Sequence, residues 1–167
     1  EAWNIGRGSP TVRIAIVDSP FQMNHPDLVA NTDPGWDVVT DVPVTSSAGY
    51  WHSTGGAGMA TATINTALGV AGALNCRILP ININGFLDEM YRAVIWSADH
   101  GVRVVNISWS GGNSPTVNES GTYLMTRARG ILAMAGVNGS GLLNYTNQPS
   151  ILCVSMTDIA DNMLSYH

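Results

Sequence analysis

The sequence contains no lysine, and charged residues of every kind are few. All seven basic residues are arginines, against twelve aspartates and glutamates, so the formal net charge at pH 7 is −5. Charged residues make up 11% of the chain, where about 25% is usual for a soluble protein. This charge balance gives no electrostatic support to a nucleic acid or an anionic membrane as partner, and both are excluded. The shortage of charge also predicts that much of the chain is buried or packs against something outside these residues.

Long apolar runs are missing as well. No segment approaches the roughly 20 apolar residues that cross a bilayer. The first ten residues, EAWNIGRGSP, have neither the basic start nor the apolar stretch of a signal peptide. The sequence therefore predicts no membrane span, and we expect any export signal to have been removed already.

Cysteine is scarce. Cys76 lies in NCRILPI and Cys153 in ILCVSM, two apolar strand-like runs in which a buried free thiol is more common than a disulfide. We expect both cysteines to be free thiols, and the pair does not identify a redox compartment.

The chain does contain a regular alternation of strand-like and helix-like segments over 167 residues, the length of one ordinary domain. Apolar and β-branched runs predict strands at 11–19, 76–84, 102–110, 130–136 and 150–158. Small residues or apolar residues at helical spacing predict helices at 57–68, 87–101 and 118–130. This alternation is typical of an α/β fold with a doubly wound parallel sheet. We expect residues 1–167 to form one such domain.

Two polar residues lie where this kind of fold gathers ligands and catalytic groups. Asp18 ends the first predicted strand, and His52 comes at or just before the first turn of the next helix. A carboxylate that orients a histidine, and a histidine that takes a proton from a nucleophile, are two thirds of a hydrolytic triad. Taken singly, an aspartate at a strand end is more often a helix cap or loop acceptor, and a lone histidine is little stronger evidence.

Seven stretches in chain order carry a family resemblance: IAIVDSP (14–20), HPDL (25–28), HSTGGAG (52–58), GVAG (69–72), RILPI (77–81), VVNISWSGG (104–112) and AMAGVNGSG (133–141). Together they resemble the subtilisin-like serine peptidases, the subtilase family. That family writes the motifs as D-[ST]-G, H-P-D-L, H-G-T-x-x-A-G, G-V-A-G, a strand, N-x-S-x-G-G and A-A-G-N-x-G. The resemblance covers nearly the whole chain and implies a subtilisin-like fold.

The resemblance also implies roles for the two polar residues. Asp18 matches the triad acid and His52 the general base of a serine endopeptidase that hydrolyses peptide bonds. The acid would hold the imidazole in the productive tautomer. The family's habit of secretion implies a secreted or extracytoplasmic location.

A substrate-binding segment follows from the same resemblance. It matches the family's edge segment, which pairs with an extended polypeptide through main-chain hydrogen bonds. Its residues here are Ser108, Trp109, Ser110 and Gly111. Trp109 could line a side-chain pocket, although a tryptophan in a half-buried strand is at least as often part of the core.

A structural calcium site is implied as well. Asp27 of HPDL, Asn65, and the main-chain carbonyls near Leu68 and Val70 match a Ca²⁺ site that many family members carry. Hard oxygen ligands of this kind suit Ca²⁺.

Three motif positions depart from the family's pattern. Pro20 and Ser53 each stand where the family has glycine, so one position loses an N–H and the other gains a side chain. The oxyanion asparagine of the family falls on Val137, and Asn138 comes one place later. Asn138 becomes the candidate oxyanion donor if the turn is shifted by one residue. Loss of such a donor costs roughly 2.7 to 4 kcal/mol of transition-state stabilisation.

The nucleophile is the largest departure. The family carries its serine in G-T-S-M-A-x-P, and nothing like this motif occurs in residues 1–167. We expect the fold to be incomplete at its C-terminus and the serine to come from a C-terminal segment or a second chain. The chain alone is then expected to be inactive.

Two other functions are weighed against the peptidase. A catalytically inactive relative that binds peptides or regulates another protein would explain the substitutions at Pro20, Ser53 and Val137. A doubly wound nucleotide-binding domain is excluded because neither G-x-G-x-x-G nor G-x-x-x-x-G-K-[ST] follows the first strand.

Overall fold

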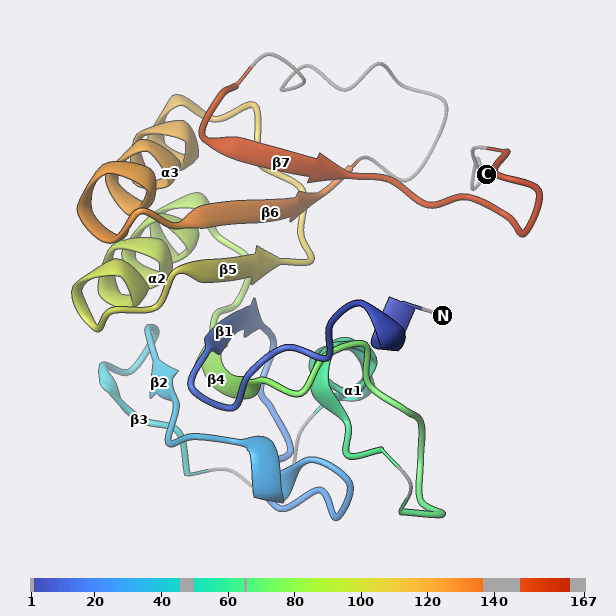
Figure 1. The fold of residues 1–167 in the computed structure, drawn as a ribbon. Coiled ribbons are helices and arrows are strands. Elements are labelled where there is room, and N and C mark those ends of the chain that lie inside the picture. The colour runs from blue at the N-terminus through green and yellow to red at the C-terminus, as the bar shows by residue number, and fades with distance from the viewer. Residues whose placement is uncertain (1, 46–49, 65, 137–147, 163–167) are drawn as a thin grey trace.

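A seven-stranded sheet forms the centre of the protein. The computed structural model describes residues 2–45, 50–64, 66–136 and 148–162. The strands are β1 Arg13–Asp18, β2 Trp36–Asp37, β3 Val42–Pro43, β4 Arg77–Asn82, β5 Val104–Ile107, β6 Ile131–Ala135 and β7 Ile151–Val154. Their order across the sheet is β3-β2-β4-β1-β5-β6-β7 (Figure 1). All neighbours pair in parallel except β2 and β3, so the predicted sheet is confirmed as mostly parallel.

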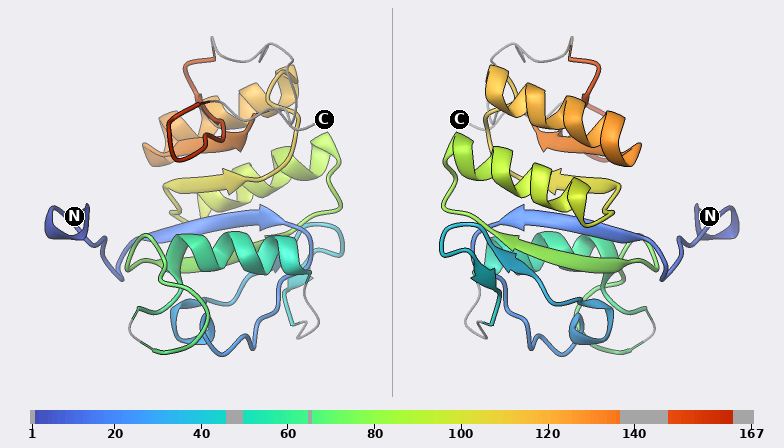
Figure 2. Two further views of the ribbon diagram at one scale, coloured as in Figure 1. Left: turned by 90° about the vertical axis from the view of Figure 1, so that its right-hand side faces the viewer. Right: turned by 90° about the vertical axis from the view of Figure 1, so that its left-hand side faces the viewer.

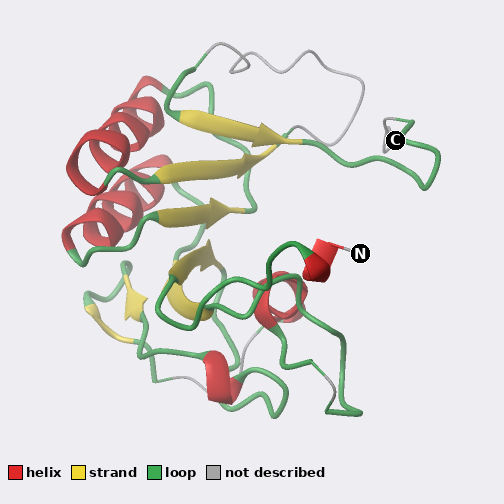
Figure 3. Cartoon of the chain, viewed as in Figure 1, coloured by secondary structure: helices red, strands yellow, loops and turns green. Residues whose placement is uncertain are grey.

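Helices cover both faces of this sheet. The helix α1, Trp51–Thr61, lies on one face, while α2, Leu87–Asp99, and α3, Pro115–Ala128, lie side by side on the other (Figures 1 and 2). Two short 3-10 turns, Ala2–Asn4 and Val29–Asn31, complete the helical elements of the described residues (Figure 3). Helices on opposite faces are what a doubly wound fold requires, as predicted. None of the described helices has both the length and the apolar character that a bilayer crossing needs.

The central strand β1 explains how two cores form around one sheet. Its side chains alternate between the faces, so Ala15 and Val17 join the core under α2 and α3 while Ile14 and Ile16 join the core under α1. A strand buried on both faces is a nearly continuous apolar run, which is the pattern the sequence has here. Asp18 ends this run and is the only acidic residue of the strand.

The helix that carries His52 differs from its predicted bounds. It was expected at 57–68 with His52 at or just before its first turn, but it begins at Trp51 and ends at Thr61. Both predicted ends are therefore wrong, while His52 does lie in the first turn. Ala62 has an extended backbone, and its carbonyl accepts a hydrogen bond from Gly72 N–H instead of continuing the helix. Tertiary hydrogen bonds of this kind override local propensity.

Other predicted ends were also too wide or displaced. The strands β5 and β7 stop at Ile107 and Val154, so 108–110 and 155–158 lie beyond these two strands. The helix α3 begins three residues early because Ser114 has an extended backbone and Pro115 suits a first helical position. The hairpin of β2 and β3 was not predicted, because each strand has only two residues. Both cysteines are free, as predicted.

Candidate active site

The Asp18 carboxylate is held rigidly at the C-terminal end of the central strand. Its side chain is only 2% exposed. Its Oδ1 accepts hydrogen bonds from the main-chain N–H of Ser19 at 2.7 Å and from the Ser19 hydroxyl at 2.9 Å. These bonds fix the carboxylate orientation and offset part of the cost of burying its charge.

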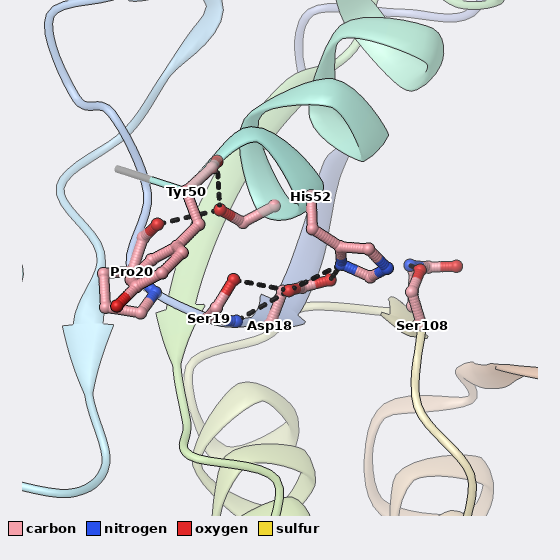
Figure 4. Close-up of polar contacts among 8 residues, drawn as sticks. Asp18, Ser19, Pro20, Tyr50, His52 and Ser108 are labelled. Carbon is pink, nitrogen blue, oxygen red and sulfur yellow. Dashed lines mark hydrogen bonds and ion pairs between the residues drawn. The ribbon is translucent and has the colours of Figure 1, made fainter. Parts of the chain in front are cut away.

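His52 meets this carboxylate from the first turn of α1. Its Nδ1 lies 2.9 Å from Oδ2 and 3.0 Å from Oδ1 of Asp18 (Figure 4). An ionised carboxylate can only accept, so Nδ1 is the donor and a neutral ring has its lone pair on Nε2. The His52 side chain is 44% exposed, which leaves Nε2 accessible to a reacting group. This arrangement can accept one proton at Nε2 while the carboxylate stabilises the resulting cation.

Trp51 lies against the same imidazole. The two rings meet edge to face, with centroids 5.5 Å apart and planes at 75°. Such a contact restricts the ring orientation in addition to the hydrogen bond. The motifs gave no role to Trp51, which directly precedes His52. Ser19 was likewise missed as a partner of Asp18, although it occupies the second position of the D-[ST] motif.

Two open cavities adjoin His52, and Ser108 lines both. The larger, of about 1100 Å³, runs along α1 and is mainly apolar. The smaller, of about 580 Å³, lies between the loops that follow β1 and β5 and includes Trp109 and Ser110. The structure thus brings three of the four predicted substrate-binding residues to the edge of the Asp18–His52 pair.

The remaining predicted substrate residue, Gly111, lies beside α2. A Cβ on Gly111 would come within 2.9 Å of Leu87 and 3.3 Å of the Met90 sulfur. Trp109 sits over Gly85, where φ is +99° and a Cβ would be 2.3 Å from the indole ring. A glycine at position 85 is therefore needed both for the backbone conformation and for the close approach of Trp109.

Ser108 itself is turned toward a neighbouring amide. Its Oγ accepts a hydrogen bond from Asn106 Nδ2 at 3.0 Å. Figure 4 shows Ser108 on the side of the imidazole away from Asp18. Among the residues that the structure describes, no hydroxyl group makes a hydrogen bond with the His52 ring. Ser108 is thus placed as a wall of the site.

The predicted oxyanion donor lies outside the described residues. Val137 and Asn138 both belong to 137–147, which the structure does not describe. The strand that leads to them, β6, is in place next to β5. The oxyanion role of Asn138 stays a prediction.

Three of the four predicted calcium ligands lie within the described residues. Asp27 is buried, and its two carboxylate oxygens accept hydrogen bonds from Thr66 Oγ1 and from the N–H of Val70, both at 3.2 Å. The Leu68 carbonyl accepts a weaker bond from the same hydroxyl, and Asn65 lies outside the described residues. Within the described ranges no three acidic, histidine or cysteine side chains cluster as a metal site. The predicted ligands are one carboxylate, one side-chain amide and main-chain carbonyls, which that kind of cluster does not include, so the Ca²⁺ ion stays a prediction.

A family model and two curated relatives point to the same family of proteins. A family model described as "Subtilase family" matches residues 9–162. Thermitase of Thermoactinomyces vulgaris is 34% identical over 99% of this chain, and the thermophilic serine proteinase of Bacillus sp. strain AK1 is 31% identical over 99%. The chain spans 62% and 43% of the length of these two relatives.

A solved structure supports the same grouping. The crystal structure of fervidolysin from Fervidobacterium pennivorans, described as related to subtilisin, superposes with a TM-score of 0.75 at 26% identity. The matched region covers 92% of this chain and 25% of the fervidolysin chain. A lanthipeptide protease shares the fold, with a TM-score of 0.76 over 98% of this chain and 53% of its own, at 22% identity. With its motifs, its sheet order and these matches, the chain belongs to the subtilase family of serine proteases.

Proposed function

We propose that this chain is the acid-bearing and base-bearing part of a serine endopeptidase that hydrolyses peptide bonds. The observation that carries the proposal is the 2.9 Å contact between His52 Nδ1 and the buried carboxylate of Asp18. This contact leaves Nε2 of His52 as the free, exposed base. A base held in one tautomer by a buried acid is the arrangement that activates a serine hydroxyl.

The proposed reaction proceeds through an acyl-enzyme. As the serine oxygen attacks the peptide carbonyl, its proton passes to Nε2 of His52. The imidazolium then gives this proton to the departing amine when the C–N bond breaks. In the second half, a water molecule attacks the ester, and His52 again takes and returns one proton. Asp18 stays ionised throughout and stabilises the imidazolium.

The serine is proposed to arrive on a segment outside residues 1–167, either further along the same polypeptide or on a second chain. The larger cavity beside His52 supports this placement, because its floor is an uncovered face of α1. Trp51 is 83% and Met59 75% exposed there, and a Cβ on Gly55 or Gly56 would meet no other described segment within 4 Å. An apolar face with small residues permits close approach of a second element.

A polypeptide is the proposed substrate. The smaller cavity places Trp109 and Ser110 next to His52, where an extended chain could lie along the loop that follows β5. The relatives support a location outside the cytoplasm for the same activity. One of them, 31% identical, is named "Halolysin-like extracellular serine protease Nep" of Natrialba magadii, and we propose that this protein is also secreted.

An inactive peptide-binding relative is the second candidate. It is favoured by the substitutions of family glycines by Pro20 and Ser53 and by valine at position 137. In that case the smaller cavity, which includes Trp109, would bind a peptide without cutting it.

Labelling with a fluorophosphonate separates the two. The probe reacts only with an activated serine, so we expect the 167-residue chain to stay unlabelled. We expect labelling once a polypeptide with a G-T-S-M-A segment from the same gene or its neighbour is added, and its loss in His52→Ala. Labelling of the chain alone would overturn the proposed source of the serine. Absence of labelling with every such segment would favour the inactive relative.

A further inference from the structure

Pro20 and Ser53, the two residues that replace family glycines, contact each other. Ser53 is buried, and its hydroxyl lies 2.8 Å from the carbonyl oxygen of Pro20 and 3.1 Å from that of Tyr50. The Pro20 carbonyl also accepts a hydrogen bond from the Tyr50 N–H at 2.8 Å. Pro20 lies two residues after Asp18, and Ser53 directly follows His52. Figure 4 shows Pro20 and Tyr50 beside the Asp18–His52 pair.

From this contact we infer that Ser53 is a positioning residue for His52. Its hydroxyl donates to the carbonyl of Pro20 and so joins the loop after β1 to the first turn of α1. One end of this connection, Ser53, directly follows His52. The other end, Pro20, lies two positions after Asp18. A glycine at position 53 could not make the bond, because it has no side-chain donor. The bond is therefore a property of this chain's own residues.

The local backbone explains why such a connection has an effect. Pro20 has no N–H to donate, so the loop after Asp18 has one fewer main-chain bond available to hold it. At the start of a helix the first N–H groups lack partners within the helix. Tyr50 N–H solves this by donating to Pro20, and Ser53 adds a second donor to the same oxygen. Two donors on one carbonyl restrict how far α1 can slide along β1.

The competing explanation is that the hydroxyl serves only its own helix. Ser53 could donate to Tyr50, three residues earlier, as serines in helices often do. Among the described residues, another buried helical serine of this chain, Ser120, makes only the hydrogen bond within its own helix. Ser120 is also buried in a helix, and its hydroxyl donates to Val117, three residues earlier, at 2.7 Å. Ser120→Ala is therefore the control for Ser53→Ala.

The test is the exchange rate of the His52 Nδ1 proton with water, measured by NMR on the histidine-labelled 167-residue chain. The chain has four histidines, so His52→Gln assigns the signal. Loss of one hydrogen bond corresponds to about a threefold to tenfold change in an equilibrium, so Ser53→Ala should raise the exchange rate by about that factor. Ser53→Thr, which keeps the hydroxyl, should restore the slow rate, and Ser120→Ala should leave it unchanged.

Equal exchange in Ser53→Ala and the unmodified chain would overturn the inference, as would an equal rise in Ser120→Ala. If the threonine does not fit the buried site, Ser53→Gly provides a second removal of the hydroxyl and must also accelerate exchange. The measurement needs no nucleophile, so it can succeed even if the proposed peptidase function fails. In the peptidase completed with its serine, Ser53→Ala should lower kcat by a similar factor and leave KM unchanged.

Discussion

Asp18 and His52 stand 34 positions apart in the chain, yet their side chains lie within hydrogen-bonding distance. The central strand delivers the carboxylate to the C-terminal edge of the sheet, and α1 starts above that edge with the imidazole in its first turn. The loop between them contributes the Pro20 carbonyl, which Tyr50 N–H contacts directly. The distance between acid and base is thus set by the sheet and the helix start together.

Replacing the acid by its amide should disable the completed peptidase. In Asp18→Asn the side chain keeps its shape, but its NH₂ group can donate to Nδ1, which favours the tautomer with the proton on Nε2. We expect kcat to fall by about 10⁴-fold, as is typical for loss of the triad acid. Asp88→Asn is the matched control, because Asp88 is exposed on α2. Hydrolysis rates of a peptide substrate by both variants check this, and comparable rates would contradict the assigned role.

Alanine at the exposed glycines of α1 should have opposite effects on the stability of this chain and on its binding to a serine-bearing segment. In Gly55→Ala and Gly56→Ala, the new Cβ meets no atom within 4 Å from outside its own stretch of helix, among the residues that the structure describes. Each substitution should therefore stabilise the 167-residue chain by roughly 0.5–1 kcal/mol, measured by urea unfolding. If a serine-bearing segment packs here, each should weaken its binding. Unchanged binding in both variants would place that segment elsewhere.

The glycine under Trp109 should behave in the opposite way. In Gly85→Ala, the Cβ would overlap the indole ring, and the residue would have to keep a positive φ. We expect a loss of about 1–3 kcal/mol in the free energy of unfolding, with a change in Trp109 fluorescence. Gly6→Ala, where a Cβ has open space, is the control. A fully stable Gly85→Ala variant would show that Trp109 does not pack there.

The Asp27 carboxylate should hold its loop even without calcium. An alanine at position 27 would remove both acceptors, the one that binds Thr66 Oγ1 and the one that binds Val70 N–H. Asp27→Ala should therefore cost about 1–3 kcal/mol in the free energy of unfolding, in calcium-free buffer containing a chelator. A thermal melt with and without Ca²⁺ checks this. A loss confined to the calcium-containing sample would indicate that Asp27 binds the ion instead.

The contact between α2 and α3 should weaken at high pH. The Tyr123 hydroxyl donates to Asp99 at 2.8 Å, and this bond, followed by burial and the charge of Asp99, raises the pKa of Tyr123 above its ordinary value. A raised pKa in the folded state means that the stabilisation is present below about pH 10 and is lost as the pH rises through the raised pKa. Tyr123→Phe should lower the urea midpoint at pH 8 and make no such difference at strongly alkaline pH.

The control for this pH effect is Tyr91→Phe, since the Tyr91 hydroxyl makes no hydrogen bond within the described part of the chain. Its urea midpoint should differ from the unmodified chain by a similar amount at both pH values. A difference for Tyr123→Phe that persists unchanged at strongly alkaline pH would contradict the assigned role of Asp99.

Periodicity and motif order alone determined the class of fold and the candidate acid and base. A β-branched run that ends in Asp18, and the alternation of strands and helices after it, predict a parallel sheet because such a sheet buries strands on both faces. These patterns are local in the sequence, so they can be recognised without knowing which segments contact one another in the folded chain. The end of α1 was missed because the hydrogen bond from Gly72 N–H to the Ala62 carbonyl, which comes from a separate segment, helps decide where the helix stops.

Only the tertiary structure decided how the motif departures relate. Nothing local in Pro20 or Ser53 shows that one accepts from the other, because the contact spans 33 positions and depends on the approach of α1 to the loop after β1. The same holds for Trp109 over Gly85, where glycine permits both the positive φ and the close approach of the indole ring. Residue types fix which groups can donate, accept or pack, whereas distances between segments follow from the packing of the whole sheet.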